Sequence, residues 1–166
     1  MQLSPHFALS ELLTTSKTQF AAAQVGGAAS GTHVRRALVA LCTTILEPVR
    51  VHVGRPVRVT SGYRCPSLNA ATPGASKTSQ HTRGEAADIQ VPGFSDGQLR
   101  DLFDWIAWES GLPFGQIIYE DKRPHDEGGA WLHVSLGAPW RAEARCGQVL
   151  TWTPASGYQA AQRPVR

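Results

Sequence analysis

The sequence predicts an α+β domain in which a small antiparallel sheet has helices packed on one of its two faces. Two long segments place apolar residues at helical spacing, and several short segments alternate apolar and polar residues. The chain has 166 residues, which fits one domain of ordinary size with a buried core. We therefore expect a single domain over residues 1–154 and a weakly ordered, flexible tail over residues 155–166.

The first third of the chain predicts two helices separated by a loop. Residues 8–15 are expected to form a short helix, and residues 24–32 (QVGGAASGT) a loop of small residues. From residue 33 to residue 53, apolar positions recur at helical spacing, at Val34, Leu38, Leu41, Ile45 and Val49. Pro48 should kink or locally end this helix, and Gly54 suits its C-terminal end.

A further helix is predicted after Ser95. Ser95 and Gln98 have the spacing of a capping box, in which each side chain bonds the backbone N–H of the other residue. Gly111 is expected to end the helix. The apolar stripe that would face the core consists of Leu99, Leu102, Phe103 and Ile106.

Five short segments predict strands, because alternating residues of a strand point to opposite faces of a sheet. The segments are residues 57–61, 86–89, 115–120, 131–136 and 147–153. Residues 65–80 are expected to form a long loop, and residues 121–129 (DKRPHDEGG) a polar hairpin loop.

Two histidines and one aspartate predict a metal site. The segment SQHTRGEAADI places His81 seven residues before Asp88, and His133 follows far downstream in the segment WLHVSL. Two imidazoles and one carboxylate are the usual protein ligands of a catalytic zinc site, which keeps its fourth position for water. A structural zinc site more often has four ligands rich in cysteine, and the sequence contains no such cluster. We therefore predict one zinc ion per chain.

The spacing of these ligands allows them to meet. Gly84 lies between His81 and Asp88 and permits a sharp turn, because it has no Cβ. In WLHVSL, alternation buries the leucine and valine neighbours and turns His133 to the opposite face. Taken singly, His81 also fits a surface loop and Asp88 a turn cap, so the prediction depends on the combination.

These residues also resemble a known family. The pattern SxHxxGxAxD, at Ser79, His81, Gly84, Ala86 and Asp88, is similar to that of the zinc D-alanyl-D-alanine carboxypeptidase family. That family shares its fold with the hedgehog signalling domain and includes many phage endolysins. The segments MQLSPHFALSEL, SGYRCPSLNAATPGASKTSQH, IIYE and WLHVS extend the resemblance over residues 1–153. It implies zinc on the free face of the sheet and a peptidoglycan stem or cross-link peptide as the substrate.

A zinc peptidase needs a carboxylate that accepts a proton and passes it to the leaving amine. Glu120 ends the strand IIYE, and antiparallel pairing with WLHVS would bring it close to His133 on one face. Hedgehog-like members have a glutamate at the end of such a strand, so the resemblance also implies Glu120 as the catalytic residue. Some members instead carry an acid three residues before the last histidine, where this chain has Ala130. The competing acids are Asp126 and Glu127, beside His125, which we expect to be a solvated loop residue.

Three further residues are candidates for substrate binding. Arg64 follows the segment Ser61-Gly62-Tyr63 and presents a planar guanidinium that suits a carboxylate or carbonyl. In the resembling carboxypeptidases, an arginine at this motif position contacts the substrate. The alternative for Arg64 is a structural salt bridge. Ser79 and Gln80 flank the first metal ligand, where they can bond the peptide or stabilise the loop.

Composition argues against other classes of protein. The net charge is +3, with a pI of about 9.0, and the positive residues are scattered, so we expect no nucleic-acid binding. A mildly basic surface favours anionic polymers such as the cell wall. The three cysteines are widely spaced and do not form a disulfide framework. Cys42 is expected in the core, and Cys65 is expected to pack beside the site rather than to bind metal.

The expected location of the protein follows from the lack of apolar segments typical of signal peptides and membrane helices. No apolar run follows a basic segment near the N-terminus, and no stretch approaches the ~20 apolar residues of a membrane helix. We expect a monomer that is made in the cytoplasm without a signal peptide, does not insert into membranes, and acts on the cell wall after release or delivery. A phage or prophage lysis enzyme fits this description.

Two other functions stay open at this point. One is a zinc-containing wall-binding or virion structural module without catalysis. The other is a zinc amidase that acts on the junction between sugar and peptide. The digestion products, sugar-linked or purely peptide, distinguish an amidase from a peptidase.

Overall fold

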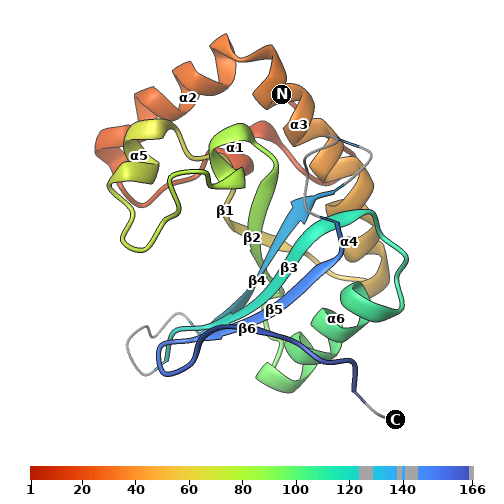
Figure 1. Cartoon of the computed structure of the whole chain (residues 1–166). Helices are drawn as coiled ribbons and strands as arrows, with labels where there is room; N and C mark the ends of the chain where they lie inside the picture. The colour runs from red at the N-terminus through yellow and green to blue at the C-terminus, as the bar shows by residue number, and fades with distance from the viewer. Residues whose placement is uncertain (124–128, 138–139, 141–145, 165–166) are drawn as a thin grey trace.

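The computed structural model of the chain has one six-stranded sheet with helices along one side and beyond one end of it (Figure 1). The structure describes residues 1–123, 129–137, 140 and 146–164. The strands, in their order across the sheet, are β1 (Arg58–Ser61), β2 (Ala86–Gln90), β4 (Ala130–Leu136), β3 (Phe114–Asp121), β5 (Gln148–Thr153) and β6 (Gly157–Ala160). The predicted α+β class is confirmed, and each predicted strand is present.

The sheet differs from the prediction at its C-terminal edge. The β1–β2, β2–β4, β3–β4 and β5–β6 pairs are antiparallel, but β5 runs parallel to β3, so the sheet is mixed. Residues 157–160, predicted as part of a flexible tail, form β6, whose pairing with β5 satisfies backbone groups that a tail would leave to water. The flexible segment therefore does not begin at residue 155, and a single domain remains our proposal.

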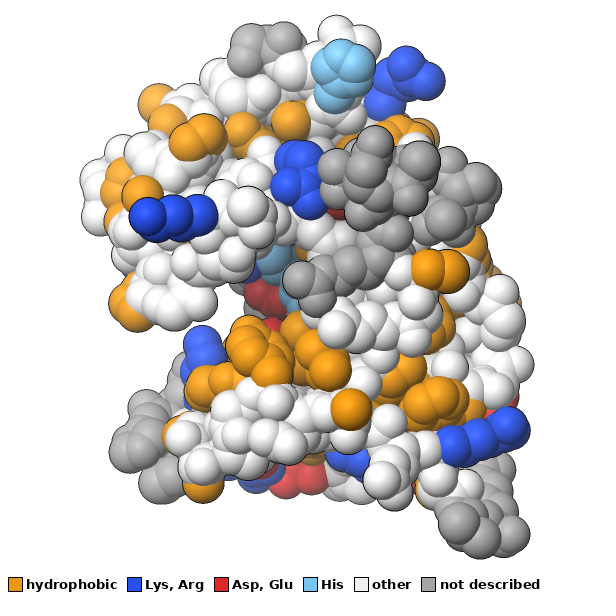
Figure 2. Space-filling view, in the orientation of Figure 1, with side chains coloured by type: hydrophobic (Ala, Val, Ile, Leu, Met, Phe, Trp, Pro, Cys, Tyr) orange, Lys and Arg blue, Asp and Glu red, His pale blue; other side chains and the backbone are white. Residues whose placement is uncertain are grey.

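The helices leave one face of the sheet free. In Figure 1, α3, α4 and α6 lie along one side of the sheet, whereas α2 and α5 lie beyond one end of it. The space-filling view shows a deep hollow on the molecule, with histidine and acidic side chains inside it (Figure 2). None of the described helices is long and apolar enough to cross a membrane. Their bounds are α1 Leu9–Leu12, α2 Ala21–Ser30, α3 Thr32–Leu41, α4 Glu47–Val53, α5 Pro66–Ala70 and α6 Asp96–Trp108, with the 3₁₀ segments η1 Thr18–Phe20 and η3 Gln80–Arg83 and the π segment η2 Cys42–Leu46.

Residues 24–32 are largely helical, so the predicted loop is wrong: they include most of α2. The small residues of this helix permit close packing, because a Cβ on Gly27 would lie 2.3 Å from the Tyr63 hydroxyl oxygen. Gln24 points inward with 1% of its surface exposed. Its amide donates to the Tyr63 carbonyl at 2.6 Å, and its Oε1 accepts from the Cys65 N–H at 2.6 Å. These tertiary contacts outweigh the weak helix propensity of glycine.

The long predicted helix of residues 33–53 is interrupted as Pro48 suggested. The π segment η2 separates α3 from α4, and Pro48 lies in the first turn of α4, where its missing N–H is tolerated. Gly54 ends α4 in the left-handed conformation, with φ 64°. Cys42, in the π segment, is fully buried in the core as predicted, and burial raises the pKa of its thiol to about 12.

Residues 65–80 contain more regular structure than the predicted loop. They include α5, and η3 begins at Gln80. Gly84 ends η3 with φ 72°, and a Cβ there would lie 2.8 Å from the backbone oxygen of Val34 in α3. Both the positive φ and the close approach require glycine at this position.

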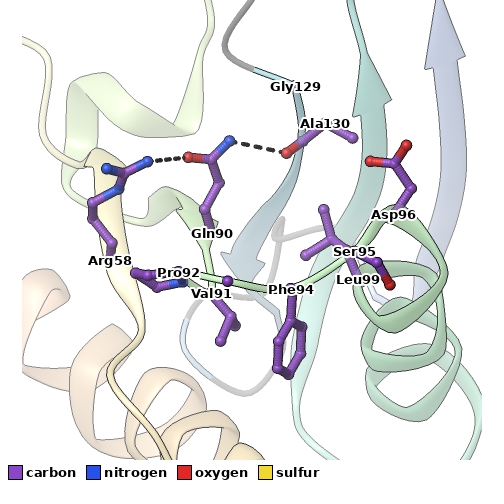
Figure 3. A pocket seen from close by; sticks show the side chains of 11 residues that line it. Arg58, Gln90, Val91, Pro92, Phe94, Ser95, Asp96, Leu99, Gly129 and Ala130 are labelled. Atoms are coloured by element: carbon purple, nitrogen blue, oxygen red, sulfur yellow. Dashed lines mark hydrogen bonds between the residues drawn. The ribbon is translucent and has the colours of Figure 1, made fainter.

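The core lies between the sheet and the helices that cover it. Ile89 of β2, and Leu132 and Val134 of β4, are fully buried on this face, and Leu38 and Phe103 face them from α3 and α6. The predicted alternation in these strands is confirmed. At one end of the sheet, Arg58 donates to the Gln90 Oε1 at 2.6 Å, and Gln90 donates to the Ala130 carbonyl at 3.0 Å (Figure 3). These bonds connect β1, β2 and β4.

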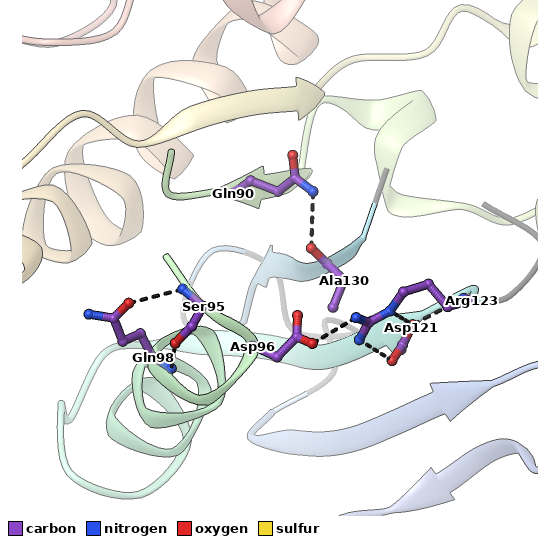
Figure 4. Close-up of polar contacts among 7 residues, drawn as sticks. All are labelled: Gln90, Ser95, Asp96, Gln98, Asp121, Arg123 and Ala130. Carbon is purple, nitrogen blue, oxygen red and sulfur yellow. Dashed lines mark hydrogen bonds and ion pairs between the residues drawn. The ribbon is translucent and has the colours of Figure 1, made fainter. Parts of the chain in front are cut away.

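Helix α6 begins as predicted and is joined to β3. The Ser95 hydroxyl accepts from the Gln98 N–H at 3.3 Å, and the Gln98 side chain accepts from the Ser95 N–H at 2.9 Å (Figure 4). Arg123, just after β3, donates to both Asp121 and Asp96 at 2.7 Å. Because this arginine is exposed, we expect the ion pairs to set the position of the helix start more than the stability of the fold.

Two neighbouring glycines of α2 test whether this segment is a packed helix. Open space surrounds Gly26, so Gly26→Ala should raise the free energy of unfolding by about 0.5–1 kcal/mol through helix propensity. Gly27→Ala adds the same propensity but overlaps Tyr63, so it should be about 1–3 kcal/mol less stable than Gly26→Ala. Urea unfolding followed by circular dichroism measures both. Equal stabilities for the two variants would contradict the close packing of α2 on Tyr63.

Candidate metal centre

The three predicted metal ligands come together on the free face of the sheet. Asp88 of β2 and His133 of β4 are direct cross-strand partners, and η3 brings His81 to the same point. Asp88 Oδ1 lies 3.0 Å from His133 Nδ1 and 3.3 Å from His81 Nε2, and the two histidine nitrogens are 3.2 Å apart. Ligand atoms about 2.0–2.1 Å from a tetrahedral zinc lie about 3.3 Å from one another, so this donor set fits that ion.

A buried hydrogen bond orients His81. Its Nδ1 donates to the Gly62 carbonyl at 2.7 Å, and 1% of the residue is exposed. This bond leaves Nε2 unprotonated and directed at Asp88 and His133, as a metal ligand requires. Gly62 must itself be glycine, because a Cβ there would lie 2.4 Å from the backbone oxygen of Leu12.

The charges of the cluster also suit a cation. Burial lowers the pKa of His81, although the Asp88 carboxylate acts in the opposite direction. Burial by itself would raise the pKa of Asp88, but the interactions with the neighbouring His81 and His133 side chains hold it well below its usual range. These shifts favour a neutral His81 imidazole and an ionised Asp88 carboxylate, the forms that bind metal.

His133 presents Nδ1 rather than Nε2 to the cluster. Its Nε2 is buried and has no hydrogen-bond partner among the described residues. The neighbouring Leu132 and Val134 are fully buried on the opposite face, so the pleat of β4 determines the side to which His133 points.

The cluster lies in a cleft of about 850 Å³. Arg64, Ser79 and Gln80, the predicted substrate-binding residues, all line this cleft. Arg64 Nε is buried and has no hydrogen-bond partner among the described residues. Its guanidinium also takes part in none of the ion pairs between described residues, which leaves it available to a ligand.

Glu120 lines the same cleft. Ile118 of β3 is the cross-strand partner of His133, so Glu120, two residues further along, is a diagonal neighbour of His133 on the same face. Burial raises the pKa of Glu120, as does the charge of Asp88, whereas His133, Lys122 and Arg64 lower it. A partly buried carboxylate with a raised pKa suits a group that accepts and returns a proton.

The other sequence candidates add no further ligand to the cluster among the described residues. The competing acids Asp126 and Glu127, and His125, fall outside the described residues. Ala130, where some relatives carry an acid, is buried at the start of β4. Cys65 lies at the N-terminus of α5, and its Sγ contacts the Ser67 hydroxyl at 3.3 Å rather than joining the metal cluster.

Gln24 and a second group of residues contribute to the site without having been predicted from the sequence. Gln24 holds the segment that contains Gly62 and Arg64, through its bonds to Tyr63 and Cys65. A single buried glutamine in a segment of small residues gives no periodic signal. The second group lines the cleft and consists of Lys122, Trp131, Trp152 and Tyr158. The aromatic residues near the strand ends were the signal that could have identified it.

The comparison with protein families agrees with this geometry. The family model described as Peptidase M15 matches residues 5–120. The matched span includes His81, Asp88, Arg64 and Glu120, but β4 with His133 lies beyond it. A comparison with curated proteins finds no match.

Metal content tests the cluster directly. We expect the purified protein to bind about one zinc per chain, and His81→Ala, Asp88→Ala and His133→Ala each to lower this content strongly, because each removes one of three ligands. Elemental analysis of dialysed protein gives the ratio, and circular dichroism verifies the fold. Cys65→Ala is the matched control, since Cys65 lies nearby and outside the cluster; it should keep its zinc. Full occupancy in His133→Ala would exclude His133 as a ligand.

Proposed function

Since the chain belongs to the M15 family of peptidases, we propose that it is a zinc peptidase that hydrolyses D-amino-acid-containing peptide bonds of bacterial peptidoglycan. Family membership supports a metallopeptidase acting on peptidoglycan. The similarity of the sequence motifs to those of phage endolysins supports a role in phage or prophage lysis, in which the enzyme reaches the wall after release or delivery.

One observation carries the proposal: the three-ligand cluster and the Glu120 carboxylate line the same open cleft. His81, Asp88 and His133 would hold the ion through the three atoms that lie 3.0–3.3 Å apart. When bound there, zinc supplies Lewis-acid chemistry that polarises a carbonyl and makes water nucleophilic near neutral pH. With three protein ligands the coordination stays open, as in catalytic rather than structural sites.

Glu120 carries the proton in this proposal. Its carboxylate lies on the same face as His133, two residues along the neighbouring strand. It accepts a proton from the attacking water and returns it to the amine that leaves when the peptide bond breaks. Its partial burial keeps the carboxylate poorly solvated, which favours this transfer in both directions.

Arg64, Ser79 and Gln80 hold the peptide. Arg64 has a buried Nε without a partner among the described residues, so it can bond a substrate carbonyl or carboxylate without first breaking a protein contact. Ser79 and Gln80 line the cleft beside His81 and offer a hydroxyl and an amide to the peptide backbone.

Mass spectrometry of digested peptidoglycan tests this function. A peptidase releases fragments with a new peptide amine or carboxyl group, whereas an amidase releases whole stem peptides from the sugar. Zinc and wall binding without any turnover would instead identify a binding or virion structural module. Chelation of the metal should abolish turnover, and added zinc should restore it.

Replacing the proposed proton carrier should separate chemistry from metal binding. Glu120→Gln should lower kcat by ~10²- to 10⁴-fold, the range typical of general acid–base groups, with zinc content and melting temperature nearly unchanged. Turnover of a defined stem peptide measures the loss. Glu127→Gln is the matched control and should retain most activity. The opposite pattern, an inactive Glu127→Gln and an active Glu120→Gln, would reject the assignment.

Arg64→Lys distinguishes a substrate contact from a structural one. Lysine keeps the charge but loses the planar pair of donors, so a substrate-binding role predicts a raised KM or a lower kcat/KM at unchanged zinc content and melting temperature. Kinetics and thermal unfolding on one preparation give both quantities. A lower melting temperature with normal KM and normal turnover per folded molecule would show that Arg64 acts through the fold.

A further inference from the structure

A row of large side chains crosses the sheet next to the metal cluster. Trp131 of β4 pairs with Glu120 of β3, Glu120 with Trp152 of β5, and Trp152 with Tyr158 of β6. Direct partners point to the same face, so two tryptophans flank the proposed proton carrier, and Tyr158 continues the row beyond Trp152. We call Trp131, Trp152 and Tyr158 the aromatic wall.

The aromatic wall is presented to the cleft rather than packed in the core. All three residues line the cleft, and 58% of the Tyr158 surface is exposed. The Trp152 and Tyr158 rings have centroids 6.2 Å apart. Figure 2 shows hydrophobic side chains along one side of the hollow that contains the histidine and acidic side chains. The neighbouring row holds His133, Ile118 and Leu150, so the aromatic wall extends the metal site toward β6.

One cation lies over the aromatic wall. Lys122 Nζ is 4.8 Å from the Trp131 ring centroid and 6.0 Å from that of Trp152. An ammonium group at this position disfavours a second cation and offers donors to hydroxyl, carbonyl or carboxylate oxygens. A ligand of the aromatic wall should therefore have an apolar face bordered by neutral or anionic oxygen atoms.

From this chemistry we propose that the aromatic wall is a subsite for a sugar ring of the glycan that carries the stem peptide. A pyranose ring has an apolar C–H face, which stacks on Trp152 and Tyr158, and hydroxyl and acetamido groups at its edge, which reach Lys122. The stem peptide itself offers mostly small or charged side chains, which do not fill three aromatic rings. The inference rests on the proposed function, because it takes peptidoglycan as the substrate.

The subsite makes a specific prediction about substrate preference. The zinc-loaded protein should cleave a disaccharide-linked stem peptide with a higher kcat/KM than the same peptide freed of its sugar. Trp152→Ala and Tyr158→Ala should each lower the ratio of these two kcat/KM values by about tenfold, because they remove a stacking surface that acts on the linked substrate. Using the ratio cancels any effect of the substitutions on Glu120.

Two control variants isolate the ring face. Gln159 lies between Tyr158 and Ala160 in β6, so its side chain points to the face opposite that of Tyr158. Gln159→Ala should therefore leave the ratio unchanged. Tyr158→Phe keeps the ring and should retain most of the preference. An equal kcat/KM for both substrates in the unmodified protein, or an unchanged ratio in both alanine variants, would overturn the sugar subsite while leaving the peptidase function intact.

A binding measurement keeps the two proposals separable. Calorimetric titration with peptide-free disaccharide should show binding that Trp152→Ala weakens by about tenfold. If no peptide is hydrolysed but this binding is present and depends on Trp152, the proposed function fails and the sugar subsite stands. If peptides are hydrolysed and the disaccharide does not bind, the sugar subsite fails alone.

Discussion

The hydrogen bond from His81 Nδ1 to the Gly62 carbonyl is the contact on which the site depends. It joins η3 to the end of β1 and fixes which nitrogen of His81 faces Asp88 and His133. Gly62 in turn lies so close to the backbone of Leu12 that no side chain fits there. The Gln24 side chain forms hydrogen bonds with the backbone of Tyr63 and Cys65, which follow Gly62 in the chain. The N-terminal helices thereby act as a support for the metal centre rather than as a separate unit.

The pleated sheet supplies the remaining geometry. Antiparallel pairing makes Asp88 and His133 direct neighbours and places Ile118 beside His133. Because the side chains of a strand alternate, the residues between these turn toward α3 and α6 and form the core. One face of the sheet thus provides stability and the other provides chemistry, so the same strands serve both without conflict.

The cleft has chemically different sides around the metal cluster. Toward β1 lies Arg64, a cation without a protein partner among the described residues, and toward β6 lies the aromatic wall with Lys122. Glu120 lies within the row of the aromatic wall, between Trp131 and Trp152, in surroundings that raise its pKa. This order of groups across the sheet gives a long substrate separate polar and apolar contacts on either side of the reacting bond. All three residues of the aromatic wall lie beyond the span matched by the family model, which ends at residue 120.

Local patterns in the sequence determined much of this protein. Alternation identified β2 and β4, and the Ser95–Gln98 spacing identified the start of α6, because each of these signals lies within a few residues. The residue types identified a candidate ligand set, although His133 lies far along the chain from His81 and Asp88. Tertiary structure decided what depends on distant partners. Helix α2 has small residues without an apolar stripe, and its packing on Tyr63 became visible only in the fold. The parallel pairing of β5, the existence of β6, and the row that brings Trp131, Glu120, Trp152 and Tyr158 together likewise follow from strand register, which one strand's sequence does not specify.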